Sequence, residues 1–315
     1  MKEKCCSRCK NPAEIELKYS GLSLCKKCFL KFFESRVRKT IRLQNLLKSD
    51  DSVAVALSGG KDSASVLYIL KKISEKIPSL EIFAVTVDEG ADSESLKAAS
   101  SLCFDFGVEH HIFSFKEETG YTLFEIVEKI ISPSEENLSR PCTYCGIIRR
   151  DILNRKVREL GGTKIATGHN LDDEVQVAMM NFIKSDIKRM ARLGFSVGMV
   201  DNPLFVPKIK ILRQCPEREV KLYAELNNIK FSKKVCPYSA DSFRGSVKEA
   251  VNLIEKNHTG SKFQMLKSAD MLIEILREHF KKEDYLKEEI KKCEICGELT
   301  SGRICRMCQV RKMLE

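Results

Sequence analysis

Apolar and polar positions along the chain follow two different periods, which change at short glycine-containing or polar breaks. A continuous apolar run at residues 52–57 has the length and β-branched content of a buried strand. Apolar positions then recur at helical spacing over 62–76, and the alternation continues through a strand at 81–88, a helix at 92–106 and a strand at 108–113. Because parallel strands need crossover helices, this order predicts a doubly wound α/β fold with a parallel sheet.

Further elements are predicted on both sides of this core. A basic amphipathic helix is expected within 26–47, a strand at 163–168, a helix at 216–226, and helices over 243–280 with a break near 257–260. We therefore expect five units: an N-terminal module at 1–30, a linker helix at 31–50, a nucleotide-binding and catalytic domain at 51–212, a helical region at 213–290 and a C-terminal module at 291–315.

The break between the first strand and the first core helix predicts an anion site. It reads Ser58-Gly59-Gly60-Lys61-Asp62-Ser63. Paired glycines let a backbone close around a phosphate, and the start of a helix offers N–H groups without partners. The common P-loop is excluded, because it requires a glycine where Val55 stands and a Ser or Thr where Asp62 stands. In a P-loop the hydroxyl of that Ser or Thr binds Mg²⁺. Because Asp62 lacks this hydroxyl, the sequence argues against an enzyme that hydrolyses the terminal phosphate of a nucleotide.

Two other segments should meet this turn, because they also follow strands of the sheet. Ligands of doubly wound sheets bind beyond the carboxyl ends of the strands. Val87 to Gly90 could contact the adenine or ribose of a nucleotide. Gly168 to Glu174 supplies the carboxylates Asp172 and Asp173, which could hold the Mg²⁺ that accompanies ATP or could serve only in capping the next helix.

The distribution of charge along the chain suggests a binding partner larger than a nucleotide. The net charge is +10, but residues 1–50 carry +8 and residues 184–234 carry +7, so the remainder sums to −5. Two basic blocks on a nearly neutral body indicate a polyanion, although solvated helix faces would produce the same pattern. No apolar run reaches the length of about 20 residues that a membrane span needs, and we expect a cytoplasmic protein.

Eight of the 14 cysteines form Cys-x-x-Cys pairs near the two ends of the chain. Such spacing in a chain without a secretion signal indicates metal binding, and four thiolates complete a structural zinc site. The expected ligands are Cys6, Cys9, Cys25 and Cys28 for one zinc ion, and Cys293, Cys296, Cys305 and Cys308 for the other. Cys5 is a competitor for the place of Cys6.

Three further cysteines leave several interpretations open. Cys142 and Cys145 begin a helical segment that continues with Arg149 and Arg150, and Cys236 follows much later before a proline. From spacing alone the first pair could be a redox dithiol, an incomplete metal site or packing residues. Together with Cys236 the pair would form a chemically attractive set of three.

These motifs, taken in order, resemble the PP-loop tRNA 2-thiouridine synthetases of the TtuA type, including the archaeal wobble-uridine thiolases. The resemblance rests on the cysteine pairs at both ends, the turn at 58–63, the segments 141–146 and 168–174, and Cys236-Pro237-Tyr238. It covers nearly the whole chain. It implies ATP-dependent replacement of a uridine C2 oxygen by sulfur, with the oxygen first adenylated, and release of AMP and pyrophosphate.

The resemblance also implies particular residues, cofactors and partners. ATP contacts are implied at Leu57, Ser58, Gly59, Gly60, Lys61, Asp62, Ser63, Val87, Gly168 and Asp173. A 4Fe-4S cluster is implied on Cys142, Cys145 and Cys236, with catalytic roles for Asp173, Arg149, Cys142 and Cys236. Some relatives carry lysine where this chain has Arg149, which keeps the charge but cannot act as a base. The implied partners are tRNA, a thiocarboxylated ubiquitin-like sulfur carrier and a second copy of the chain.

Three alternatives remain at this stage. The T-loop uridine is the favoured target, with the wobble uridine as the alternative. The same reaction could instead use a cysteine persulfide without a cluster. A third hypothesis is a zinc-knuckle tRNA-binding protein without enzymatic activity, whose affinity would fall steeply with salt.

Overall fold

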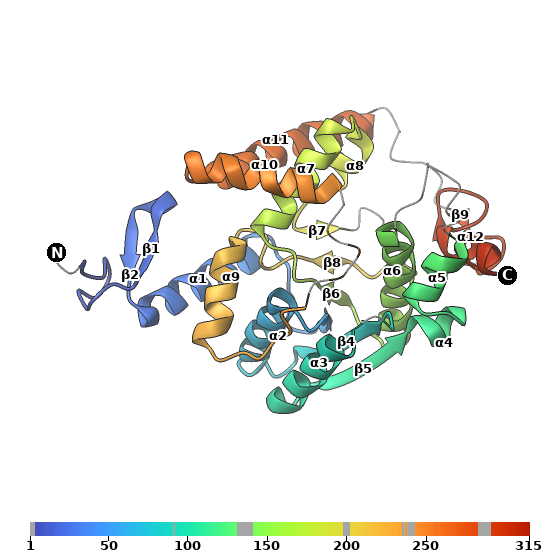
Figure 1. The fold of residues 1–315 in the computed structure, drawn as a ribbon, viewed down its shortest axis with the longest axis horizontal. Coiled ribbons are helices and arrows are strands. Elements are labelled where there is room, and N and C mark those ends of the chain that lie inside the picture. The colour runs from blue at the N-terminus through green and yellow to red at the C-terminus, as the bar shows by residue number, and fades with distance from the viewer. Residues whose placement is uncertain are drawn as a thin grey trace.

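The computed structural model describes residues 4–90, 92–130, 141–197, 202–234, 236, 238, 243–282 and 291–315. Figure 1 shows a central sheet with helices on both faces and a small module at each end of the long axis. Each of these modules contains a group of four cysteines. Within the described residues, no helix has both the length and the apolar content that crossing a bilayer would require. Pro237, on which part of the sequence resemblance rests, lies outside the described residues.

The central sheet has the strand order β5-β4-β3-β6-β8-β7. Its strands are β3 (Ser52–Ala56), β4 (Glu81–Asp88), β5 (Glu109–Ser114), β6 (Lys164–Ala166), β7 (Ser196–Val197) and β8 (Lys208–Ile209). The first five in this order are parallel, and β7 runs antiparallel to β8 at the edge. The chain leaves β3 toward β4 and later returns on its other side as β6. A ligand crevice is expected where the order diverges in this way, at the carboxyl ends of β3 and β6.

Helices cover both faces of the sheet. They are α1 (Lys26–Leu43), α2 (Lys61–Ser74), α3 (Ser93–Phe106), α4 (Phe115–Thr119), α5 (Leu123–Ile130), α6 (Pro141–Glu159), α7 (Leu171–Ile183), α8 (Ile187–Ala191), α9 (Glu217–Leu226), α10 (Phe243–Asn257), α11 (Ser261–Lys282) and α12 (Arg306–Leu314). The helices α10 and α11 pack on α7 and α8 and form the upper layer in Figure 1.

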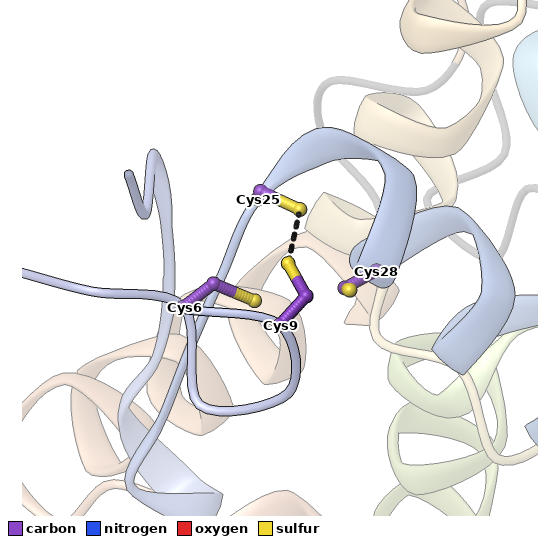
Figure 2. Close-up of side chains that lie close together, drawn as sticks. All are labelled: Cys6, Cys9, Cys25 and Cys28. Atoms are coloured by element: carbon purple, nitrogen blue, oxygen red, sulfur yellow. Dashed lines mark hydrogen bonds between the residues drawn. The ribbon is translucent and has the colours of Figure 1, made fainter. Parts of the chain in front are cut away.

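The N-terminal module is a small hairpin followed by α1. It consists of β1 (Ile15–Leu17), a 3-10 turn at Lys18–Ser20 and β2 (Leu22–Leu24). Cys6, Cys9, Cys25 and Cys28 point toward one another between the hairpin and the start of α1 (Figure 2). The C-terminal module repeats the plan with the short strands β9 (Lys291–Lys292) and β10 (Leu299–Thr300), followed by α12.

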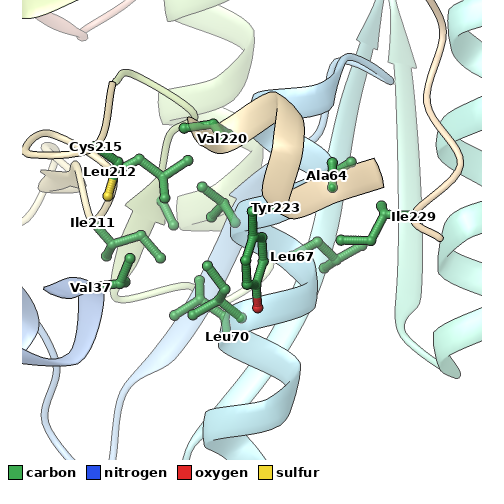
Figure 3. Packing of buried hydrophobic residues seen from close by; sticks show 14 of the residues in the cluster. Val37, Ala64, Leu67, Leu70, Ile211, Leu212, Cys215, Val220, Tyr223 and Ile229 are labelled. Atoms are coloured by element: carbon green, nitrogen blue, oxygen red, sulfur yellow. The ribbon is translucent and has the colours of Figure 1, made fainter. Parts of the chain in front are cut away.

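Successive residues of β3 show how the sheet separates two layers of the core. Val53 and Val55 pack with α1, α2 and α9, whereas Ala54 packs with α6 on the opposite face. Alternation of this kind is expected when both faces of a parallel sheet are covered. Figure 3 shows Leu67 of α2 beside Tyr223 of α9 in the larger layer.

The predicted fold class is confirmed, including the parallel sheet and the break between α10 and α11. The predicted domain boundaries stay predictions. Residues on both sides of the boundary at 212 share the larger core layer, since α9 packs against α2.

Candidate active site and metal centres

The glycine turn after β3 is held in shape by its own side chains and by α3. Gly59 has φ +75°, and a Cβ added there would lie 2.1 Å from the carbonyl oxygen of Ser95. The Ser63 hydroxyl accepts a hydrogen bond from the Ser58 N–H at 3.2 Å and donates one to the Gly60 carbonyl at 3.1 Å. Glycine is therefore required at position 59, and the start of α2 faces the crevice with a fixed loop.

Gly168 brings the segment after β6 against this turn. A Cβ at Gly168 would lie 2.8 Å from the backbone nitrogen of Ser63. Asn170 caps α7 and donates from Nδ2 to Asp62 Oδ1 at 3.1 Å. The predicted meeting of the two segments at one edge of the sheet is therefore present in the structure.

The charged residues of the turn are engaged with each other and with α9. Lys61 Nζ lies 2.8 Å from Asp62 Oδ2 and 3.0 Å from Glu217 Oε1. Burial raises the pKa of Asp62, although the Lys61 charge opposes this shift. Because Lys61 already has two carboxylate partners, a phosphate entering the turn would compete with Glu217 for this ammonium.

A pocket opens beside the turn at the carboxyl ends of β3 and β4. Leu57, Ser58 and Val87, all predicted to contact ATP, line it together with Arg149 and Cys236. The remaining lining residues are Ala56, Val85, Thr86, Asp88, Glu89, Asp92, Ser95, Leu96, Leu153 and Lys234. Asp92 caps α3 and pairs with Lys234 at 3.3 Å, so it ties the pocket wall to the segment that carries Cys236.

The three middle cysteines lie near one another beside this pocket, and Cys236 is the one that lines it. Cys142 donates from Sγ to the carbonyl oxygen of Tyr238 at 3.6 Å, which places the start of α6 beside the segment containing Cys236. Burial raises the pKa of the Cys145 thiol to about 12, and the charges of Cys236 and Cys142 add to the shift. Thiolates of an iron–sulfur cluster bind different irons and so stand farther apart than ligands of a single ion. Three thiols converging from α6 and a distant segment fit that requirement.

Arg149 connects the cysteines to the pocket wall. Its guanidinium donates to Cys145 Sγ at 3.1 Å and forms an ion pair with Glu89. Burial lowers the pKa of Arg149, but the Glu89 charge and the neighbouring thiol outweigh it, so the pKa rises. Arg149 is therefore a permanent cation between the thiols and the nucleotide pocket.

The two carboxylates after β6 have different surroundings. Asp172 is buried, with Oδ1 bound to Lys262 and Oδ2 accepting from the Glu217 N–H at 2.7 Å. Asp173 accepts from Arg244 at 3.3 Å, and burial raises its pKa although that arginine opposes the shift. Asp173 is therefore better suited than Asp172 to bind an ion or to transfer a proton.

Each terminal cysteine group has the geometry of a metal site. Within each group the four sulfur atoms all lie within 4.8 Å of one another. Zinc–sulfur bonds of about 2.3 Å in a tetrahedron place neighbouring sulfurs about 3.8 Å apart. Cys9 and Cys25 are 3.6 Å apart, as are Cys296 and Cys305 (Figure 2 shows the first pair). Cys6, not Cys5, belongs to the N-terminal group.

Several residues near the site carried no recognisable signal in the sequence. Glu217, which binds Lys61, is the first residue of α9 and is distant in sequence from the turn. Asp92 and Ser95 line the pocket because α3 begins beside the turn. Asp92 could have been recognised as a helix cap, but its contact with Lys234 follows from the tertiary fold alone.

Two protein families match the chain. Residues 6–30 match the N-terminal LIM domain of the 2-thiouridine synthetase TtuA, and residues 32–251 match the PP-loop domain. Among similar curated proteins, a probable sulfurtransferase of Methanocaldococcus jannaschii is 38% identical over 95% of this chain and 85% of its own length. The tRNA 2-thiolation protein NcsA of Haloferax volcanii is 35% identical over 98% of this chain and 99% of its own length.

The chain is also similar to a tRNA-5-methyluridine(54) 2-sulfurtransferase of Pyrococcus horikoshii, with 33% identity over 96% of this chain and 92% of that protein. Among solved structures, the U34-tRNA thiolase NcsA from Methanococcus maripaludis, described with its [4Fe-4S] cluster, has a TM-score of 0.81 and 36% identity. That match covers 100% of this chain and 97% of the other.

Proposed function

The chain belongs to the PP-loop tRNA thiolase family of the TtuA and NcsA type, and we propose that it is an ATP-dependent tRNA uridine 2-sulfurtransferase. In this reaction the uridine C2 oxygen attacks the α-phosphate of ATP, and pyrophosphate leaves. Sulfur then replaces the adenylated oxygen, and AMP leaves with that oxygen.

The observation that carries the proposal is the shared pocket. Leu57 and Ser58 of the glycine turn, Arg149 and Cys236 line one cavity, although they come from three distant parts of the sequence. Activation of an oxygen and its replacement by sulfur require that nucleotide and sulfur meet at the same atom. A pocket with the phosphate-binding turn on one wall and a cysteine on another supplies this arrangement.

For the nucleotide, we assign the phosphates to the turn and the start of α2, and the adenosine to the wall formed by Leu57 and Val87. The assigned contacts are Leu57, Ser58, Gly59, Gly60, Lys61, Asp62, Ser63, Val87, Gly168 and Asp173. Asp173 would hold the accompanying Mg²⁺ or accept a proton. Its solvent access supports ion binding, and its raised pKa supports proton transfer. Arg149 would stabilise negative charge that develops at the α-phosphate.

For the sulfur, we assign Cys142, Cys145 and Cys236 as ligands of a 4Fe-4S cluster. When bound, such a cluster supplies an iron without a protein ligand, which can carry the sulfur atom. The proximity of the three cysteines, one of which lines the pocket, supports the assignment. The residues of this chain orient the thiols, and Arg149 keeps a cation beside Cys145.

The terminal modules would each hold one structural zinc ion. Four thiolates complete a tetrahedral zinc and leave no open position, so these modules would stabilise the fold rather than react. We further propose a thiocarboxylated ubiquitin-like protein as sulfur donor and a homodimer as the working form. Both are carried over from the sequence resemblance.

The target uridine is a separate question, because similar proteins act at different positions. The T-loop position expected from the sequence has support from the relative named for uridine 54. The wobble position has support from the solved NcsA structure, whose identity of 36% and TM-score of 0.81 make it the better-matched template. We therefore place the wobble uridine first and the T-loop uridine second.

The decisive experiment combines anaerobically purified protein with ATP, sulfide and unmodified tRNA. We expect pyrophosphate release that depends on tRNA, and a 2-thiouridine whose position is found by mass spectrometry of nuclease fragments. Binding of tRNA without AMP and pyrophosphate formation would favour the non-enzymatic alternative.

The cluster is tested by Cys236→Ala, with Cys103→Ala as the matched control. Cys103 is a buried cysteine of α3 and does not line the pocket. We expect the Cys236 variant to lose the broad iron–sulfur absorbance and the thiolation activity, and the Cys103 variant to keep both. Full activity in an iron-free preparation would instead support the persulfide mechanism.

A further inference from the structure

Two cations beside the active site have no acidic partner among the described residues. Arg150 follows Arg149 on α6, and Lys208 begins β8. Neither forms an ion pair with a carboxylate in the described part of the chain, although most cations around them do. The charges that act on Lys208 are those of Arg150 and Lys210, both positive.

The neighbouring basic residues show how unusual this is. Lys210 pairs with Glu174 at 2.6 Å, and Arg213 binds Glu174 at 2.9 Å and also Asp270. These two members of the basic block at 184–234 therefore have structural roles. Both carboxylate oxygens of Glu174 are bound, one by Lys210 and the other by Arg213. Lys208 lies in the same block but receives no part of that compensation.

The position of Arg150 directs its charge toward the active site. A Cβ added at Gly146 would lie 3.0 Å from Arg150 Nη1, so the guanidinium folds back over Gly146 toward the start of α6. That end of the helix carries Cys142 and Cys145. Consecutive helical residues are rotated by about 100°, so Arg149 and Arg150 face different flanks of α6. Arg149 faces Glu89 and the nucleotide pocket.

Lys208 is the second cation, and it lies on strand β8 of the central sheet. It pairs in register with Ile165 on β6, the strand that leads into Gly168. Its charge also helps to lower the pKa of His169, the residue after Gly168, a shift that arises mainly from burial. Burial and the Arg150 charge lower the pKa of Lys208 itself to about 8. Arg150 is exposed and Lys208 is half-buried, so an anion can reach both cations from solvent and relieve the repulsion between them.

We propose that Arg150 and Lys208 bind a phosphate of the RNA strand beside the uridine that enters the active site. The inference rests on the proposed function and deepens it by naming where the RNA backbone is held. The phosphates of ATP are assigned to the turn and the start of α2, and α2 packs on the opposite face of the sheet from α6, which carries Arg150. A phosphate bound at Arg150 and Lys208 would fix the strand while the base points toward Cys236 and Asp173.

The same pair could instead take the pyrophosphate that leaves ATP, so the experiment measures both ligands. Affinity for unmodified tRNA is measured by fluorescence anisotropy on the full-length protein without ATP, over a series of salt concentrations. The variants are Lys208→Gln and Arg150→Gln, with Lys208→Arg as the charge-preserving partner. Lys76→Gln is the matched control, because it removes an exposed lysine just after α2, on the segment that leads to the amino end of β4 and so away from the carboxyl ends of the strands.

Each loss of charge should remove about one phosphate contact and reduce the slope of log affinity against log salt by about 1. The ratio of variant to native Kd should then shrink about threefold between about 50 and 200 mM salt. Lys208→Arg and Lys76→Gln should keep the native slope. Native slopes in both glutamine variants would overturn the inference.

Pyrophosphate is tested as an inhibitor of the same proteins in the thiolation assay. Variants that lose pyrophosphate inhibition but keep native tRNA affinity would show that the site takes the product, which also overturns the RNA assignment. A native protein that binds no tRNA at all would contradict the proposed function itself. The two kinds of failure are therefore distinguishable.

Discussion

Gly168 shows how one missing side chain permits the active site to form. The backbone after β6 approaches the glycine turn so closely that a Cβ would lie 2.8 Å from Ser63 N and 3.0 Å from the Asp62 carbonyl carbon. These neighbours are backbone atoms at the start of a helix and cannot rotate away. Position 168 therefore couples the turn to the segment that carries Asp173.

Gly168→Ala should push the two segments apart. We expect an increase in KM for ATP and a loss of about 1–3 kcal/mol in the free energy of unfolding, the usual cost of forcing an extra carbon into a packed site. Steady-state kinetics and urea unfolding measure the two effects. Gly302→Ala is the control, because its Cβ would come no closer than 3.9 Å to any neighbouring atom. Equal behaviour of the two variants would contradict the steric argument.

Lys208 should make the free energy of unfolding depend on pH. Its pKa of about 8 in the folded chain lies below the ordinary value of 10.5, mainly because of burial. Between these values the unfolded chain binds more protons, so this group makes stability rise with pH. Below pH 8 the full penalty of the buried charge is present.

Lys208→Met should therefore be more stable than the native chain at pH 7, by about 1–3 kcal/mol. The gain should fade as the pH rises from 8 toward 10.5. Urea unfolding at several pH values, with exposed Lys76→Met for comparison, measures the difference. A gain that stays constant over this range would mean that Lys208 is not the titrating group.

At the scale of elements, the C-terminal module supports the helix that carries two of the candidate cluster ligands. Buried residues of α12 pack in one cluster with Ile148 and Cys145 of α6. Arg158, near the other end of α6, forms a two-pronged ion pair with Glu298 of the module and also donates to the carbonyl oxygen of Leu204 at 2.7 Å. Both ends of α6 are thus held from outside.

Glu298→Ala tests this support. Loss of a partly buried, two-pronged pair should lower the free energy of unfolding by about 1–3 kcal/mol and reduce the iron retained after purification. Glu294→Ala is the matched control in the same module, since its pair with Arg303 is exposed and should contribute about 0–1 kcal/mol. Thermal unfolding and iron analysis distinguish the two variants. Similar losses in both would argue against a specific role for the Glu298 contact.

Which elements could be predicted from sequence depended on the length of their pattern. The segment from β3 to β5 was predicted because each element has five or more residues with one clear period. The two-residue strands β7 and β8 were missed, since two residues define no period. Their place in the sheet comes from pairing with β6, which is a tertiary effect.

At the scale of the molecule, the two cysteine modules lie at opposite ends of the long axis, with the sheet between them. The N-terminal module is tied to the body through Arg36 of α1, which pairs with buried Glu219 of α9 at 2.9 Å and donates to Tyr19 of the module. Each module thus has its own anchor, and the two metal sites should be independent of each other.

This independence predicts the zinc content of variants. The native chain should bind about two zinc ions, and Cys25→Ser and Cys305→Ser should each lose one of them. Cys5→Ser should keep both, because Cys5 lies outside the N-terminal group. Elemental analysis of purified protein gives the count. Loss of both ions from one single variant would contradict the independence of the modules.

The candidate site was predictable in parts. The turn at 58–63 and the terminal cysteine groups could be recognised from sequence, because their residue types and spacings predict anion binding and zinc binding directly. The meeting of Cys236 with Cys142 and Cys145 had no local signal and was expected through family resemblance. That Arg150 and Lys208 have no carboxylate partner among the described residues could not be predicted, because it depends on which carboxylates reach the neighbouring cations.

The packing of α12 beneath α5 and α6 also has a consequence for biosynthesis. Domains begin to fold as they emerge from the ribosome, and the PP-loop region emerges well before Leu314. Until α12 has emerged and docked, the helix bearing Cys142 and Cys145 lacks part of its support. The cluster proposed for these cysteines should therefore be loaded only after the C-terminal module has been translated.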